Sequence, residues 1–106
     1  MDSKRYVFLS FEFHKEGRRW TARCKELGTA TFGRSVTEAE TRLQEAVVLH
    51  LNTLDDVGET ERFFKEHNIK FYSTKPKHDL PVYIPATKGT FGKPYIHPVR
   101  GLVGIA

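Results

Sequence analysis

The chain has 106 residues, which is the length of one ordinary domain. Apolar residues make up 39% and charged residues 28%, a balance typical of a globular protein with a packed core. A single cysteine, Cys24, excludes an internal disulfide and a CxxC metal site. No stretch approaches the roughly 20 apolar residues of a membrane span, and the N-terminal apolar run is too short for a signal peptide. We therefore expect a cytoplasmic protein without membrane contact.

The formal net charge of +4 is unevenly distributed. Residues 1–58 contain nine Lys/Arg and nine Asp/Glu, whereas residues 59–106 contain eight against four. A modest basic C-terminal part serves solubility, or it contacts nucleic acid or an acidic protein surface.

Alternating residues predict strands in the first third of the chain. Residues 5–13 place Val7, Leu9 and two phenylalanines on one face. Residues 18–24 alternate again after a polar turn at Gly17, so the two runs predict a β-hairpin in which Trp20 faces inward. Residues 29–32 predict a short third strand.

A helix is predicted over residues 36–57. Ser35 and Glu38 form the pattern of a capping box, and Gly58 is a typical C-terminal stop. Val48 and Leu49 lie off the apolar stripe of this helix and indicate a second buried surface, such as an oligomer contact. The stripe itself comprises Val36, Ala39, Leu43, Ala46, Val47, His50, Leu54 and Val57.

Residues 59–67 predict a short second helix that ends at Asn68, and residues 69–72 predict a fourth strand. All five prolines fall between Pro76 and Pro98, which excludes a further long helix. Within this part, residues 82–84 and 91–96 predict edge strands or docking segments, and the apolar residues 101–106 predict burial against another surface.

The expected fold class is therefore α+β: a three- to four-stranded antiparallel sheet with one long helix packed across it, in the order β-β-β-α-(α)-β. We expect residues 1–73 to form this domain and residues 74–106 to form an extended, Pro-rich, basic tail.

Residues that could support catalysis or metal binding are scattered. No two of the five histidines share one element at metal-ligand spacing, and His50 on the helix stripe is expected to be a core or boundary residue. Cys24 is expected to be a buried thiol. Glu12 and Glu26 are the candidate acid pair, and such glutamates are usually solvated. We therefore expect no catalytic residue, metal or cofactor.

A basic cluster surrounds Trp20 and could bind RNA by charge and stacking. Because Trp20 is expected to face the core, Arg19 and Arg23 on the opposite face are the better candidates for contacts with an acidic partner. Together with Val48 and Leu49 they form the predicted partner-binding set.

Residues 6–54 resemble the HicB-like antitoxin family. The resemblance rests on a hairpin with Trp20 and Ala22, the following Leu27-Gly28, and the string Gly-Arg-Ser-Val-Thr-Glu-Ala at residues 33–39. It continues in the helix through Leu43, Glu45, Ala46, Leu49 and Leu51. The proline that the family often has before its third strand is missing here.

The resemblance implies a dimer or tetramer that neutralises a small mRNA-cleaving toxin protein by covering its RNA-binding surface. The Pro-rich tail cannot form the DNA-binding helices that many family members carry. Three alternatives remain open: a nucleic-acid-binding module that uses the basic tail, a stand-alone oligomer with an unknown ligand and, as a minor one, a degenerate nuclease that uses Glu12 and Glu26.

Overall fold

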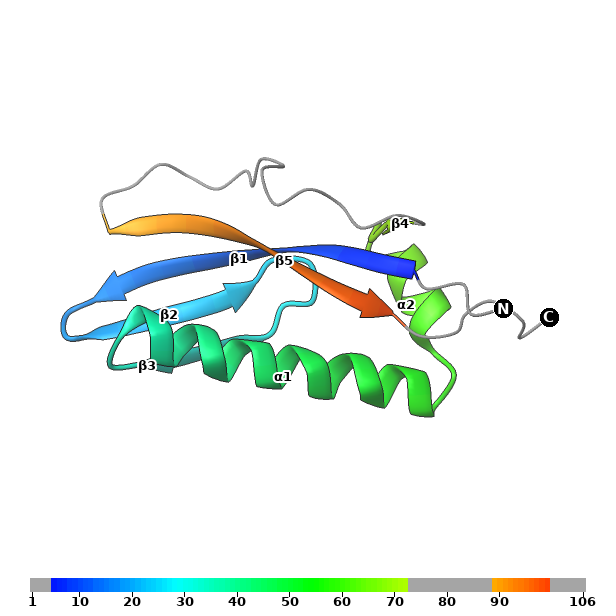
Figure 1. Ribbon diagram of the computed structural model, residues 1–106, viewed down its shortest axis with the longest axis horizontal. Coiled ribbons are helices and arrows are strands. Elements are labelled where there is room, and N and C mark those ends of the chain that lie inside the picture. The colour runs from blue at the N-terminus through cyan, green and yellow to red at the C-terminus, as the bar shows by residue number, and fades with distance from the viewer. Residues whose placement is uncertain (1–4, 73–88, 100–106) are drawn as a thin grey trace.

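The computed structural model describes residues 5–72 and 89–99. A five-stranded antiparallel sheet packs with one face against one long helix, so the predicted α+β class is confirmed (Figure 1). No helix in the described ranges covers the opposite face, which we call the outer face. The elements are β1 (Arg5–Glu16), β2 (Arg19–Cys24), β3 (Ala30–Gly33), α1 (Val36–Asp56), α2 (Thr60–Glu66), β4 (Phe71–Tyr72) and β5 (Thr90–Val99).

Strand β1 is the centre of the sheet. Its C-terminal half pairs with β2 and its N-terminal end pairs with β4, so these two strands follow each other along one edge of β1. Its other edge pairs with β5 over ten residues, from Arg5 opposite Val99 to His14 opposite Thr90. β3 pairs with the far side of β2.

The strands differ from the prediction at their ends and in their number. β3 is shifted by one residue to Ala30–Gly33, and β4 is shortened to Phe71–Tyr72. Residues 91–96, which we expect in the tail as an edge strand or a docking segment, belong to Thr90–Val99, a longer fifth strand of the same sheet. The segments predicted at residues 82–84 and 101–106 lie outside the described residues.

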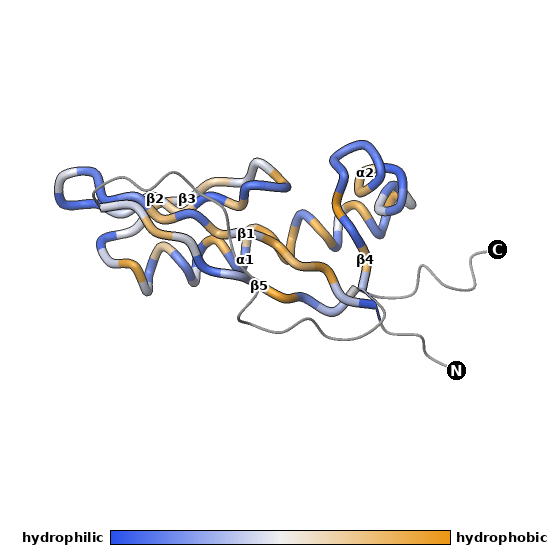
Figure 2. The backbone as a smooth tube through the Cα atoms, turned by 90° about the horizontal axis from the view of Figure 1, so that it is seen from above, coloured by the Kyte–Doolittle hydropathy of each residue, from blue (hydrophilic) through white to orange (hydrophobic). Residues whose placement is uncertain are grey.

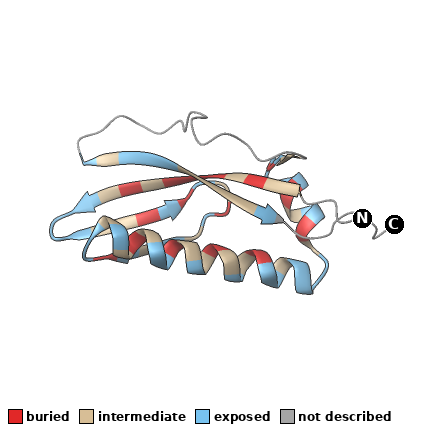
Figure 3. Ribbon diagram, viewed as in Figure 1, coloured by how far each residue is buried: buried red, intermediate tan, exposed pale blue. Residues whose placement is uncertain are grey.

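The core lies between α1 and the sheet (Figures 2 and 3). Alternate residues of β1 point toward the helix and are fully buried, as predicted from the period of two. Leu51 belongs to the core although it lies off the predicted stripe, and Val57 is 64% exposed because it follows the end of α1. The buried side chains of β1 and α1 are Val7, Leu9, Phe11, Phe13, Ala39, Leu43, Val47 and Leu51.

The start of α1 follows from its capping residues. The Ser35 hydroxyl accepts a hydrogen bond from the Glu38 backbone N–H at 3.1 Å, as predicted. The Glu38 carboxylate accepts from the backbone N–H of Arg34 at 3.3 Å, one residue earlier than a standard capping box. Just before this cap, a Cβ at Gly33 would lie 2.7 Å from the backbone nitrogen of Ala39, so the β3–α1 corner needs glycine.

The outer edges of β3 and β5 each have a feature that hinders strand addition. On β3, the guanidinium of Arg42 donates a hydrogen bond of 2.9 Å to the carbonyl of Phe32. On β5, Pro94 lies opposite Ser10, whose backbone N–H and C=O bond toward the β2 side. Because hydrogen-bonding directions alternate along a strand, the backbone nitrogens of Pro94 and Pro98 point away from β1, toward the outer edge of β5. A strand added at that edge would need N–H donors there, and proline has none.

In the described part of the chain, neither helix combines the length and the apolar character that crossing a bilayer requires.

Candidate partner-binding surfaces

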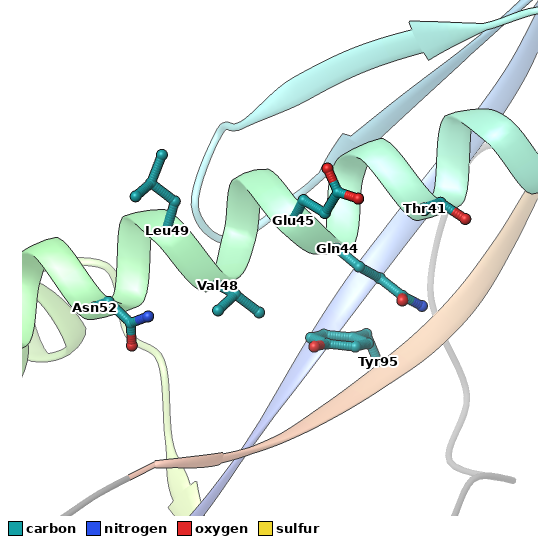
Figure 4. Close-up of a pocket in the computed structure, with 7 residues that line it drawn as sticks. All are labelled: Thr41, Gln44, Glu45, Val48, Leu49, Asn52 and Tyr95. Atoms are coloured by element: carbon teal, nitrogen blue, oxygen red, sulfur yellow. The ribbon is translucent and has the colours of Figure 1, made fainter.

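A groove of about 530 Å³ separates α1 from β5. Its helix wall is one continuous stripe, because its residues recur every three or four positions. Figure 4 shows Gln44 and Val48 directed toward the ring of Tyr95, while Glu45 and Leu49 project on the other side of the helix. The lining residues are Thr41, Gln44, Glu45, Val48, Leu49, Asn52 and Tyr95.

The floor of the groove is fixed by contacts on both sides of Tyr95. Its ring stacks on buried Phe11 with centroids 4.8 Å apart, and its hydroxyl lies 3.1 Å from Nδ1 of His97. Burial raises the pKa of Tyr95 and lowers the pKa of His97, so both side chains are neutral near pH 7. At one end, Lys93 on β5 forms a 2.7 Å ion pair with Glu40 on α1.

Two of the predicted partner-binding residues lie at this groove. Val48 is half-buried, whereas Leu49 is 69% exposed, a high value for a leucine in a helix interior. Tyr95 was missed, because its segment was assigned to the tail. The alternation of Phe91, Lys93 and Tyr95 along β5 was the available signal for a strand face.

Helix α1 is acidic although the whole chain is basic. It contains five carboxylates and one arginine, a net charge of −4 against +4 for the chain. Arg42 pairs with Glu38, and Lys93 with Glu40. The three other carboxylates form no ion pair with a described residue, and they lie one to two helical turns from Leu49. They are Glu45, Asp55 and Asp56.

The other two predicted residues, Arg19 and Arg23, lie on the outer face of the sheet. They are exposed, and they are therefore not brought together with Val48 and Leu49. The guanidinium of Arg19 lies 5.1 Å from the ring centroid of Phe32, which is 53% exposed. Arg23 is the cross-strand neighbour of Glu12. Sequence reasoning missed Phe32 as a surface residue.

The residues considered for catalysis make hydrogen bonds and packing contacts that support the fold. Glu26 accepts hydrogen bonds from the backbone N–H of Ser10 at 2.7 Å and from its hydroxyl at 2.8 Å. His50 contacts Thr29 and packs edge-on against Phe63. In residues 5–72 and 89–99, no group of three or more His, Cys, Asp or Glu side chains is placed to hold a metal ion.

Cys24 is fully buried beside the core residues of β1. Burial raises the pKa of its thiol to about 12, and the nearby Glu26 carboxylate acts in the same direction. The thiol is therefore protonated at neutral pH, which removes the thiolate that nucleophilic catalysis needs.

A scan against models of protein families, a search of curated proteins and a search of solved structures each found no match to this chain.

Proposed function

We propose that this chain is a non-catalytic, cytoplasmic protein-binding module that resembles a HicB-like antitoxin and binds a small basic toxin protein through α1. The observation that supports it is the exposed Leu49 beside the α1–β5 groove, flanked on its side of α1 by the acidic residues Glu45 and Asp56. An apolar centre with a charged rim is the usual arrangement of a protein interface.

The two parts of this surface would have different roles. Burial of Leu49 and Val48 against a partner would supply affinity, because central apolar anchors dominate interface energetics. The surrounding carboxylates would attract a basic partner and set its orientation. A toxin that binds RNA needs a basic surface, so an acidic helix can cover that surface and block mRNA cleavage.

The same charges disfavour a second copy of the chain as the occupant. Two α1 helices with a net charge of −4 each would repel across a twofold axis. The blocked edges of β3 and β5 also disfavour association by strand addition. If the chain forms the proposed dimer or tetramer, we expect it to use surfaces other than these.

The test begins with tagged full-length chain in nuclease-treated native lysate. A small basic protein recovered in stoichiometric amount is then purified, and its RNA cleavage is measured with and without the chain. Leu49→Asp should weaken the complex at least tenfold and restore cleavage. Val57→Asp is the matched control, since Val57 is 64% exposed but lies outside the groove.

Recovery of the chain alone, or a partner whose RNA cleavage the chain does not inhibit, would overturn the antitoxin proposal. Equal binding of the partner by Leu49→Asp and Val57→Asp would show that the interface does not include this part of α1. Release of all bound material by nuclease would favour a nucleic-acid-binding module instead.

A further inference from the structure

We propose that the outer face of the sheet around Phe32 and Arg19 binds single-stranded nucleic acid, with one base stacking on this pair. The site lies at the β2–β3 end of the molecule, on the side of the sheet opposite α1. It is therefore separate from the proposed protein-binding groove, and the two proposals can fail independently.

Phe32 offers a ring face to solvent. It lies on an edge strand, it is 53% exposed, and its outer-face neighbour across the ladder is Thr21. The Arg19 guanidinium stands over the ring at 5.1 Å. Aromatic rings and guanidinium planes are the two groups on which proteins stack unpaired bases, and here they already form a pair.

The backbone that carries Phe32 is held on two sides. Its carbonyl accepts the 2.9 Å hydrogen bond from Arg42, which is itself paired with Glu38. The next residue, Gly33, is buried with no space for a Cβ against α1. Because the ring stands on a fixed backbone, little conformational entropy is lost when a base stacks on it.

Two further arginines neighbour this pair in the sequence: Arg18 precedes Arg19, and Arg34 follows Phe32 by two residues. Arg18, Arg19 and Arg34 are all exposed, and none forms an ion pair with a carboxylate in the described ranges. Glu16 is the cross-strand neighbour of Arg19, yet the guanidinium turns to Phe32 instead. These arginines can therefore contact the phosphates on either side of a stacked base.

The surroundings fit a nucleotide better than a folded protein. A stable protein interface buries about 800 Å² on each partner around an apolar centre. Here the exposed ring of Phe32 has polar neighbours across the strands of the outer face. Thr21 lies next to it, and His14 follows, with its Nδ1 2.7 Å from the Thr90 hydroxyl. One base needs only one ring face and nearby cations, which is what this surface provides.

The test is fluorescence anisotropy of the full-length chain with labelled single-stranded RNA and DNA of twelve nucleotides, over a salt series. Phe32→Ala should weaken binding roughly 5- to 150-fold, the range for loss of one stacked base. Phe32→Trp should retain binding. Arg19→Ala with Arg34→Ala should reduce the slope of affinity against salt. Circular dichroism and thermal unfolding check that each variant is folded.

Matched controls lie elsewhere on the same chain. Val57→Ala removes an exposed apolar residue just after α1, and Arg62→Ala removes an exposed arginine from α2; both should bind nucleic acid as the unmodified chain does. Equal binding by Phe32→Ala and the unmodified chain, equal affinity for duplex and single strands, or no binding at low salt would overturn the proposal. Capture of an acidic protein that Phe32→Ala releases would do the same.

Discussion

Cys24 illustrates how burial decides the chemistry of a single residue. Its thiol lies in the core beside β1, and its pKa of about 12 leaves roughly one thiolate in 10⁴ molecules at pH 8. We expect native protein to react with a thiol reagent only after transient opening, and urea-unfolded protein to react at once. The measurement is the labelling rate at pH 8 with and without urea. Fast labelling of folded protein would contradict a buried, protonated thiol.

Single residues of the candidate surfaces were predictable to different degrees. Val48 and Leu49 stood out because helical spacing placed them away from the apolar stripe. Phe32 did not, because a four-residue strand beside two glycines is too short for alternation to assign a face. The cation–π contact of Arg19 with Phe32 depends on the β2–β3 register, which no local pattern specifies.

At the scale of the elements, β1 has a short stretch between its pairings with β2 and β4. There a side chain, not a strand, accepts the hydrogen bond of the β1 backbone. Glu26 accepts the Ser10 N–H at the point where β2 has ended and β4 has not begun. Glu26→Ala should lower the free energy of unfolding by about 1–3 kcal/mol, because a buried N–H and hydroxyl lose their acceptor. Glu26→Gln, which keeps one carbonyl acceptor, should lose less. Urea unfolding measures both, and an unchanged midpoint for Glu26→Ala would contradict this role.

The sequence predicted the elements that local signals specify. The hairpin and α1 were found because alternation, a capping serine and a terminal glycine all lie within the segments themselves. Residues 91–96 were expected only as an edge strand or docking segment of the tail, because no local pattern identifies the strand with which they pair. Pro94 and Pro98 are tolerated in β5 because their nitrogens face away from β1, and this depends on pairing with a strand some 85 residues earlier in the chain.

At the scale of the whole molecule, Pro94 and Pro98 keep the sheet from growing. Replacing both with threonine would add two N–H donors to the edge of β5 that faces away from β1, without removing any bond to β1. We expect the double variant to self-associate more strongly with rising concentration, measured by light scattering. The single variant Pro94→Thr should lie between the double variant and the unmodified chain. Identical mass distributions for all three would contradict edge protection.

The pairing of β1 with β5 also sets an order of events during synthesis. At 5–20 residues per second, a ribosome needs roughly 4–15 seconds between completing β1 and reaching the start of β5. Throughout that interval one edge of the central strand lacks β5, its partner in the folded protein, since β2 and β4 both occupy the other edge. The nascent chain is therefore most exposed to misassembly and chaperone capture at the strand on which the rest of the sheet is built.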